Sequence, residues 1–239
     1  MRLTEFKLLS FDCYGTLIDW EAGLLAALAP LMARAGMGAE QALADFSQME
    51  SAQEAETPGM RYAEILTHVH VRLAHAWRVA GTVTEHAAFG ASIPDWPAFA
   101  DSAAALAELK KTYKLVILSN VDRASFIGSN RRLGVVFDAV HTAEDIGSYK
   151  PDPRNFRFLL DRCAEQGIGR EEILHVAQSL YHDHGPANDA GIASCWIDRR
   201  AGRPGGATKT PAQAPRYGWR FGSLAELVSA VQAERGGSV

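Results

Sequence analysis

Polar residues that could do chemistry stand directly after two predicted strands of this chain. Asp12 ends the first apolar run and is followed by Thr16, and Ser119 and Asn120 end a second apolar run. Lys150 lies farther along, in the turn "SYKPDP". A lone carboxylate at a strand end often caps a turn, but it can also act as a nucleophile, and a nearby lysine would keep it ionised by lowering its pKa. The strands and helices that surround Asp12 help to distinguish these two roles.

The surrounding sequence shows two patterns. Residues 24–34, 40–52 and 61–79 have the apolar spacing of helices, with no convincing strand between them. From about residue 95 onward, helices alternate with short apolar strands. These later strands are predicted at 114–120, 136–142, 173–179 and 193–198, with a last helix at 223–234.

Strands separated by helices predict an α/β fold, a Rossmann-like doubly wound parallel sheet with right-handed crossovers. We expect a core domain formed by residues 1–17 and 94–239 and an inserted helical cap domain at residues 18–93. The segment 199–218 is rich in glycine and proline and is predicted to be a surface loop.

In such a sheet the carboxyl ends of the strands meet at one edge, and ligands bind there. The first strand brings Asp12 and Thr16 to this edge, and the second brings Ser119. The fourth strand runs into "AQSLYHDHG", which contains Ser179 and Asp183. The topology therefore predicts that polar groups from separate parts of the sequence converge on one site.

Composition limits the class of ligand. The 239 residues are 47% hydrophobic, enough for a large core, and the formal net charge is −4 without any block of lysine or arginine. Such a chain offers little to neutralise a row of phosphates, so nucleic-acid binding gets no support. A small molecule is the expected partner.

The three cysteines, Cys13, Cys163 and Cys195, have neither disulfide nor metal-ligand spacing. The first residues, "MRLTEFKLLS", lack a basic region followed by a long apolar one, and no segment has the roughly 18 continuous apolar residues of a membrane span. We expect a cytoplasmic protein in a reducing setting, without membrane contact.

The order of these motifs resembles the haloacid dehalogenase superfamily, and within it the L-2-haloacid dehalogenase (type II) branch. "FDCYGTL" is similar to the nucleophile motif, "LSN" to the second motif and "YKPDPRNF" to the lysine motif, and an acidic fourth motif surrounds Asp183. The resemblance covers nearly the whole chain, and the first and third motifs are the specific ones.

Two positions separate the branches of the superfamily. Phosphatases of this superfamily carry a second aspartate two residues after the nucleophile and hold Mg²⁺ partly through an acid in the fourth motif. Here these positions are Tyr14 and Gln178. Because a leaving alkoxide would lack a proton donor and a hard cation would lack an anionic ligand, phosphoryl transfer is disfavoured and no metal or other cofactor is expected.

The resemblance implies a hydrolase in which the Asp12 carboxylate attacks C2 of a small carboxylic acid, most simply an (S)-2-haloacid, and water then cleaves the resulting ester. Lys150 would keep Asp12 ionised and lie near the charge that develops, while Thr16 and Ser119 would orient carboxylate oxygens. The expected site consists of catalytic Asp12, Lys150, Thr16, Ser119 and Asp183 with substrate-binding Tyr14, Asn120, Ser179 and Trp20.

Some positions depart from the family pattern. The cap arginine that receives the halide aligns with Ser47, no arginine occurs between Met37 and Met60, and the tyrosine after the lysine motif is Phe156. Either His182 or Asp183 could position the hydrolytic water.

These departures keep several alternatives open. The same nucleophile could open a C–N bond in a strained cyclic amino acid, or the protein could be a Mg²⁺-dependent phosphatase or a non-catalytic binder of small acids. The actual substrate and the oligomeric state stay open, with a homodimer among the expectations.

Overall fold

The computed structural model describes residues 1–201, 211 and 213–237. Half of the predicted surface loop 199–218, namely residues 202–210 and 212, lies outside these residues. The helical and strand elements run in the following order: η1 (Leu3–Glu5), β1 (Leu8–Phe11), α1 (Trp20–Ala35), α2 (Ala39–Glu56), α3 (Tyr62–Ala76), α4 (Val83–Gly90), η2 (Ile93–Asp95), α5 (Ser102–Leu109), β2 (Lys114–Ser119), α6 (Arg123–Leu133), β3 (Ala139–Thr142), α7 (Ala143–Ile146), α8 (Arg154–Ala164), η3 (Arg170–Glu172), β4 (Ile173–Ala177), η4 (Leu180–His184), α9 (Gly185–Asp189), β5 (Ala193–Ile197), β6 (Trp219–Phe221) and α10 (Leu224–Gly236).

The strands form one parallel sheet in the order β3-β2-β1-β4-β5-β6. This confirms the predicted α/β class with its doubly wound parallel sheet. The first apolar run forms β1, and the four strands predicted at 114–120, 136–142, 173–179 and 193–198 are present with shorter bounds. The structure adds β6, which has only three residues and pairs at the edge of the sheet through Cys195 and Trp219, so its sequence carries little periodicity.

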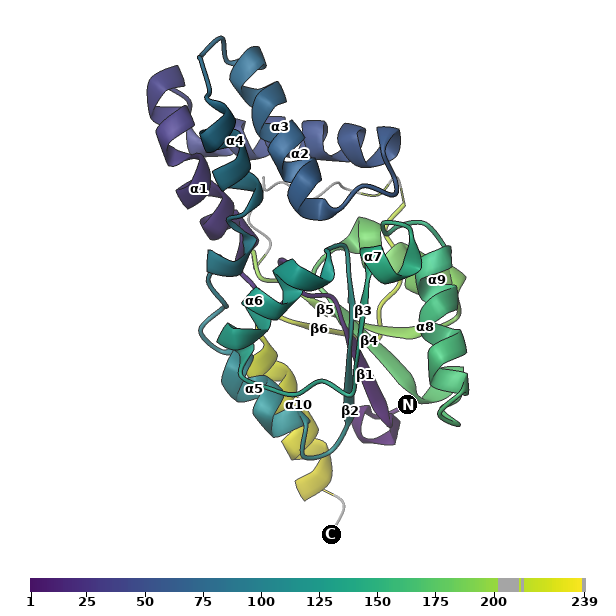
Figure 1. Ribbon diagram of the computed structural model, residues 1–239. Helices are drawn as coiled ribbons and strands as arrows, with labels where there is room; N and C mark the ends of the chain where they lie inside the picture. Colours follow the sequence, from purple (N-terminus) through teal and green to yellow (C-terminus); the bar gives the residue numbers. More distant parts are fainter. Residues whose placement is uncertain (202–210, 212, 238–239) are drawn as a thin grey trace.

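Helices cover both faces of the sheet, with α5, α6 and α10 on one face and α8 and α9 on the other (Figure 1). Side chains alternate between the faces along each strand. On β1, Leu9 and Phe11 join the core cluster that includes α5, α6 and α10, whereas Leu8 joins the cluster that contains α8. The central strands β1, β2 and β4 are mostly apolar because they are buried on both faces.

Helices α1–α4 follow β1 and lie above the carboxyl ends of the strands (Figure 1). Asp19 begins α1 by accepting a hydrogen bond from the amide of Ala22 at 3.2 Å, and Gly36, with φ of 65°, ends it. Thr82 and Glu85 form a capping box at the start of α4. The division into core and cap domains, with boundaries near residues 17 and 94, stays a prediction.

None of the described helices is by itself long and apolar enough to cross a membrane. Helices α1 and α2 reach the required length and composition only as a pair, which is bent by 109°.

The position of β1 in the sheet determines where Asp12 lies. Strands β2 and β3 are wound to one side of β1, and β4, β5 and β6 to the other. The point where the winding direction changes is the usual ligand site of such sheets. Asp12 follows β1 directly, and its amide donates to the carbonyl of Val176 on the neighbouring β4 at 3.1 Å.

Candidate active site

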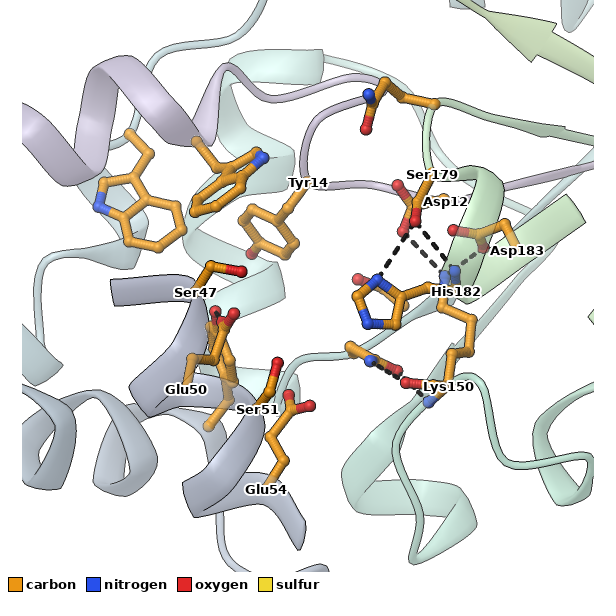
Figure 2. A pocket seen from close by; sticks show the side chains of 16 residues that line it. Asp12, Tyr14, Ser47, Glu50, Ser51, Glu54, Lys150, Ser179, His182 and Asp183 are labelled. Atoms are coloured by element: carbon orange, nitrogen blue, oxygen red, sulfur yellow. Dashed lines mark hydrogen bonds and ion pairs between the residues drawn. The ribbon is translucent and has the colours of Figure 1, made fainter. Parts of the chain in front are cut away.

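A cavity of about 80 Å³ lies between the carboxyl edge of the sheet and helix α2 (Figure 2). Its size suits a molecule of a few heavy atoms. Eight of the nine predicted site residues line it, and Thr16 lies directly behind Asp12. The described residues that line it are Asp12, Tyr14, Trp20, Ser47, Glu50, Ser51, Glu54, Tyr62, Trp96, Ser119, Asn120, Lys150, Gln178, Ser179, His182 and Asp183.

The carboxylate of Asp12 is held by a hydrogen bond on each oxygen. Oδ2 accepts from the hydroxyl of Thr16 at 2.7 Å, and Oδ1 accepts from Nζ of Lys150 at 2.9 Å. The turn between Asp12 and Thr16 requires Gly15, whose φ is 94°. Thr16 is itself fixed, because its hydroxyl accepts from the amide of Gln178 at 3.0 Å.

Lys150 is buried, with 2% of its surface exposed, and its ammonium group uses all three donors. Nζ lies 2.9 Å from Oδ1 of Asp12, 2.6 Å from Oδ1 of Asp183 and 2.9 Å from the carbonyl oxygen of Leu118. The side-chain amide of Asn120 holds the backbone of Lys150, since Oδ1 accepts from its amide at 2.6 Å and Nδ2 donates to its carbonyl at 2.9 Å. Asn120 thus positions the lysine while also lining the cavity.

The charges of this buried group depend on one another. Burial would lower the pKa of Lys150, but Asp12 and Asp183 outweigh it and raise that pKa, so the lysine is charged. Burial would raise the pKa of Asp183, but Lys150 and His175 lower it below its usual range. For Asp12, burial raises the pKa and Asp183 adds to this; Lys150 lowers it, as the sequence predicts, without cancelling the rise.

Ser119 offers a hydroxyl to the cavity. The side chain is 2% exposed, and its Oγ has no hydrogen-bond partner among the residues that the structure describes. Buried hydroxyl groups almost always have a partner, and one without a partner at a cavity wall is a natural contact for a ligand.

The turn after β4 is a π-helical segment, η4, and its residues His182 and Asp183 also line the cavity. Ser179 caps it: its Oγ accepts from the amide of His182 at 3.0 Å and lies 3.2 Å from Nδ1 of the same residue. Asp183 points from η4 toward Lys150 (Figure 2). The hydroxyl of Ser179 is therefore engaged within η4.

Aromatic rings form another wall. Tyr14 packs edge-on against Trp96 with ring centroids 5.7 Å apart, and its hydroxyl lies 2.9 Å from Oγ of Ser129. Trp20 packs against Phe46 of α2 at 5.8 Å. Both predicted aromatic residues, Tyr14 and Trp20, thus reach the cavity, and the structure adds Trp96.

Helix α2 presents a polar face to the cavity. Ser47, Glu50, Ser51 and Glu54 recur at helical spacing and lie opposite Asp12 (Figure 2). Glu50 accepts a hydrogen bond from the hydroxyl of Tyr62. The sequence prediction considered only Ser47 on this helix. The i, i+4 spacing of the two glutamates gave a signal for a shared face, but nothing in the sequence said which way that face points.

The sequence of this chain is similar to those of several known proteins. A model of the haloacid dehalogenase-like hydrolases matches residues 6–191. An (S)-2-haloacid dehalogenase from Pseudomonas putida is 32% identical over 107 residues, which are 44% of this chain and 45% of that protein. A phosphoserine phosphatase from Thermus thermophilus is 32% identical over 109 residues, 44% of this chain and 42% of that protein. These matches span less than half the length of the curated relatives.

Solved structures share the fold over almost the whole chain. The L-2-haloacid dehalogenase from Xanthobacter autotrophicus with chloropropionic acid covalently bound superposes with a TM-score of 0.78, at 18% identity, covering 95% of this chain and 98% of that one. Another L-2-haloacid dehalogenase gives 0.76 at 20% identity, covering 95% and 99%. At these identities the likeness is one of fold. Because the family model covers well over half of the sequence, this protein belongs to the haloacid dehalogenase-like hydrolases.

Proposed function

We propose that this protein hydrolyses the bond between C2 and a leaving group in a small 2-substituted carboxylic acid, with an (S)-2-haloacid as the lead substrate. The observation that supports this most is the Asp12 carboxylate, held by Thr16 and Lys150 at the wall of a small cavity. A carboxylate fixed in this way can attack a bound carbon without first losing rotational freedom. Ser119 supports the choice of an acid, because its hydroxyl can donate to a substrate carboxylate.

In the first step, an oxygen of Asp12 forms a bond to C2 while the bond from C2 to the halogen breaks, and the halide leaves with the electron pair. Halide needs no proton on departure, so the absence of an acid at Tyr14 is no obstacle. The attack inverts C2. The product of this step is an ester between Asp12 and the substrate.

In the second step, water attacks the ester carbon of Asp12, and the bond between that carbon and the substrate oxygen breaks. Asp183 accepts a hydrogen bond from the water, and Lys150 offsets the charge that develops at the ester oxygen. The 2-hydroxy acid leaves with a proton, and the Asp12 carboxylate is restored. One halide ion and one proton are released in each turnover.

The origin of the product oxygen tests the covalent route. With enzyme in excess over (S)-2-chloropropionate in H₂¹⁸O, we expect an unlabelled product and label in the peptide that contains Asp12. Direct attack by water would place the label in the product and leave the peptide unlabelled, and that result would contradict the ester. Under excess substrate, chloride release and formation of the R-configured hydroxy acid measure turnover.

A magnesium-dependent phosphatase is less well supported by these residues. Nζ of Lys150 already bridges Asp12 and Asp183, at 2.9 and 2.6 Å, where a cation would need the same carboxylates. We found no set of three or more metal-ligating side chains within the described residues. Turnover of p-nitrophenyl phosphate that requires Mg²⁺ and stops with EDTA would favour the phosphatase; we expect EDTA to leave chloride release unchanged.

A second candidate is hydrolytic opening of a C–N bond in a strained cyclic amino acid. Glu50 and Glu54 lie opposite Asp12, on the side where a leaving group would depart. Carboxylates repel a departing halide but attract an ammonium group. Attack of Asp12 on C2 would break the bond from C2 to a protonated ring nitrogen, and hydrolysis of the ester would then give an open-chain amino hydroxy acid.

Azetidine-2-carboxylate serves as the probe for this candidate. The product would be 4-amino-2-hydroxybutyrate, and Glu50→Gln should reduce its formation at least 10-fold, whereas Glu40→Gln, on the exposed start of the same helix, should leave it unchanged. Chloride release without ring opening would select the haloacid. Binding of both acids without any adduct at Asp12 would indicate a non-catalytic binder.

A further inference from the structure

A buried histidine lies directly behind the site without lining the cavity. His175 is on β4, is fully buried and points Nε2 at Oδ1 of Asp183, 3.0 Å away. Its other ring nitrogen, Nδ1, lies 3.1 Å from Oγ of Ser10 on β1. All other residues of β4 are apolar, and a buried imidazole among them is costly unless it is hydrogen-bonded.

The two carboxylate oxygens of Asp183 differ in their hydrogen bonds. Nζ of Lys150 and Nε2 of His175 both bind Oδ1, at 2.6 and 3.0 Å. Oδ2 receives no hydrogen bond from a residue within the described part of the chain, and Asp183 lines the cavity. Two donors on the same oxygen fix the rotation of the carboxylate and leave Oδ2 available to a water molecule.

The directions of the two hydrogen bonds of His175 follow from which of its partners can donate. An ionised carboxylate only accepts, and the pKa of Asp183 lies below its usual range, so Nε2 of His175 carries the proton. In a neutral imidazole Nδ1 then accepts from the hydroxyl of Ser10. The ring of Phe156 packs edge-on against the imidazole at 5.0 Å and restricts its tilt.

We propose that His175 is a positioning residue that holds Asp183 so that Oδ2 orients the water for hydrolysis of the Asp12 ester. This inference rests on the proposed ester mechanism. His175 touches neither the cavity nor Asp12, so it acts only through Asp183. Formation of the ester depends on Asp12 and Lys150, whereas its hydrolysis also depends on where the water sits. Loss of His175 should therefore slow the second step much more than the first.

The two steps can be timed separately. With (S)-2-chloropropionate, quenched single-turnover reactions followed by mass spectrometry of the Asp12 peptide report ester formation and decay. We expect His175→Phe to slow ester decay at least 10-fold, because a small misplacement of the attacking water has an effect of about this size. The ester should then accumulate, while the rate of its formation should change less than about 3-fold. Equal losses in both steps, or none, would overturn the proposal.

A conservative variant separates positioning from general damage to the core. His175→Gln keeps an N–H donor near the place of Nε2 and should restore most of the ester decay. His184→Gln is the matched control, because His184 is also fully buried but bonds Ser194 and the carbonyl of Ala177 instead of Asp183. It should lower stability without making the ester accumulate. Accumulation in this control to the same degree as in His175→Phe would contradict the specific role of His175.

A readout without substrate tests the contact itself. In the protein with ¹⁵N-labelled histidine, the Nε2–H signal of His175 should be present in the wild type, absent in His175→Gln and shifted in Asp183→Asn. The Nε2–H signal of His184, which donates to Ala177, provides the internal reference. An unshifted His175 signal in Asp183→Asn would overturn the proposal. If chloropropionate gives neither chloride nor ester, the proposed function fails for that acid, and this spectrum still decides the contact.

Discussion

At the scale of single residues, the site depends on how Asp12 and Lys150 share a buried environment. The two side chains are 138 residues apart in the sequence and meet at 2.9 Å. Lys150 also binds Asp183, so one ammonium group compensates two carboxylates. Neither carboxylate can be treated independently of this lysine.

Asp12→Asn should abolish halide release while leaving the fold intact, because the amide has nearly the same shape but is a poor nucleophile. We expect a loss of at least 1,000-fold in kcat and an unchanged circular dichroism spectrum. Mass spectrometry must exclude deamidation back to aspartate. Turnover close to wild type by a protein shown to contain asparagine would refute the role of Asp12.

Lys150→Gln should move the titration of Asp12 to higher pH. The pKa of Asp12 already lies above its ordinary value of 3.8 because of burial, and Lys150 opposes this rise. Asp12 must be ionised to attack, so activity is lost as the pH falls through this pKa. Removal of the lysine should therefore shift the acidic limb of the pH–activity profile to higher pH. It should also lower kcat at pH 7 by about 100-fold or more. Carbon NMR of labelled aspartate follows the same shift without turnover; an unchanged titration would be inconsistent with the ion pair.

At the scale of elements, the return from the helices α1–α4 to the sheet is tightly packed. Trp96 follows η2, is 1% exposed and lies against Gly23 of α1. A Cβ at position 23 would come within 2.3 Å of the indole ring. Trp96 also lines the cavity, so this packing connects the angle of α1 with the shape of the site.

Gly23→Ala should destabilise the protein although it replaces glycine within a helix. Helix propensity favours alanine by about 1 kcal/mol, but overpacking costs about 1–3 kcal/mol, because the added Cβ would have to displace the buried side chain of Trp96. Thermal unfolding should show a lower Tm, by about 2–4 °C for each kcal/mol of net loss. Gly236→Ala, in α10 with open space around the added Cβ, is the control and should not lower Tm. Equal Tm values for both variants would contradict the packing.

At the scale of the whole molecule, buried histidines make the fold sensitive to acid. His184 lies inside the protein, and burial lowers its pKa from 6.5 to about 4. Burial likewise lowers the pKa of His70 to about 4, and its Nδ1 lies 2.7 Å from Nδ1 of His86. The folded protein resists protonation of both groups.

The free energy of unfolding should therefore fall as the pH is lowered from about 6.5 to about 4. In this window the unfolded chain binds protons that the folded chain excludes, and a shift of this size at one buried group is equivalent to about 3 kcal/mol. Urea unfolding at pH 7, 5.5 and 4 measures the change. His184→Gln should reduce the pH dependence in this window, and a variant with the same dependence as wild type would show that His184 does not contribute.

The sequence by itself determined the class of fold and much of the site. Apolar strands between helices predicted the parallel sheet, because strands buried on both faces carry a recognisable pattern. Since carboxyl ends of parallel strands share an edge, the meeting of Asp12, Ser119 and Asp183 at one cavity followed from topology. Edge strand β6 was missed because three residues are too few for a periodic signal.

Only the tertiary structure decided the contacts that depend on side-chain direction. Glu50 and Glu54 face Asp12 because α2 packs on α3 in one particular rotation, and that rotation is determined by residues far apart in the sequence. His175 meets Asp183 because η4 turns the chain back over the end of β4. Topology places a residue at an edge, but packing decides which atom it touches, and the charge of a buried group depends on that atom.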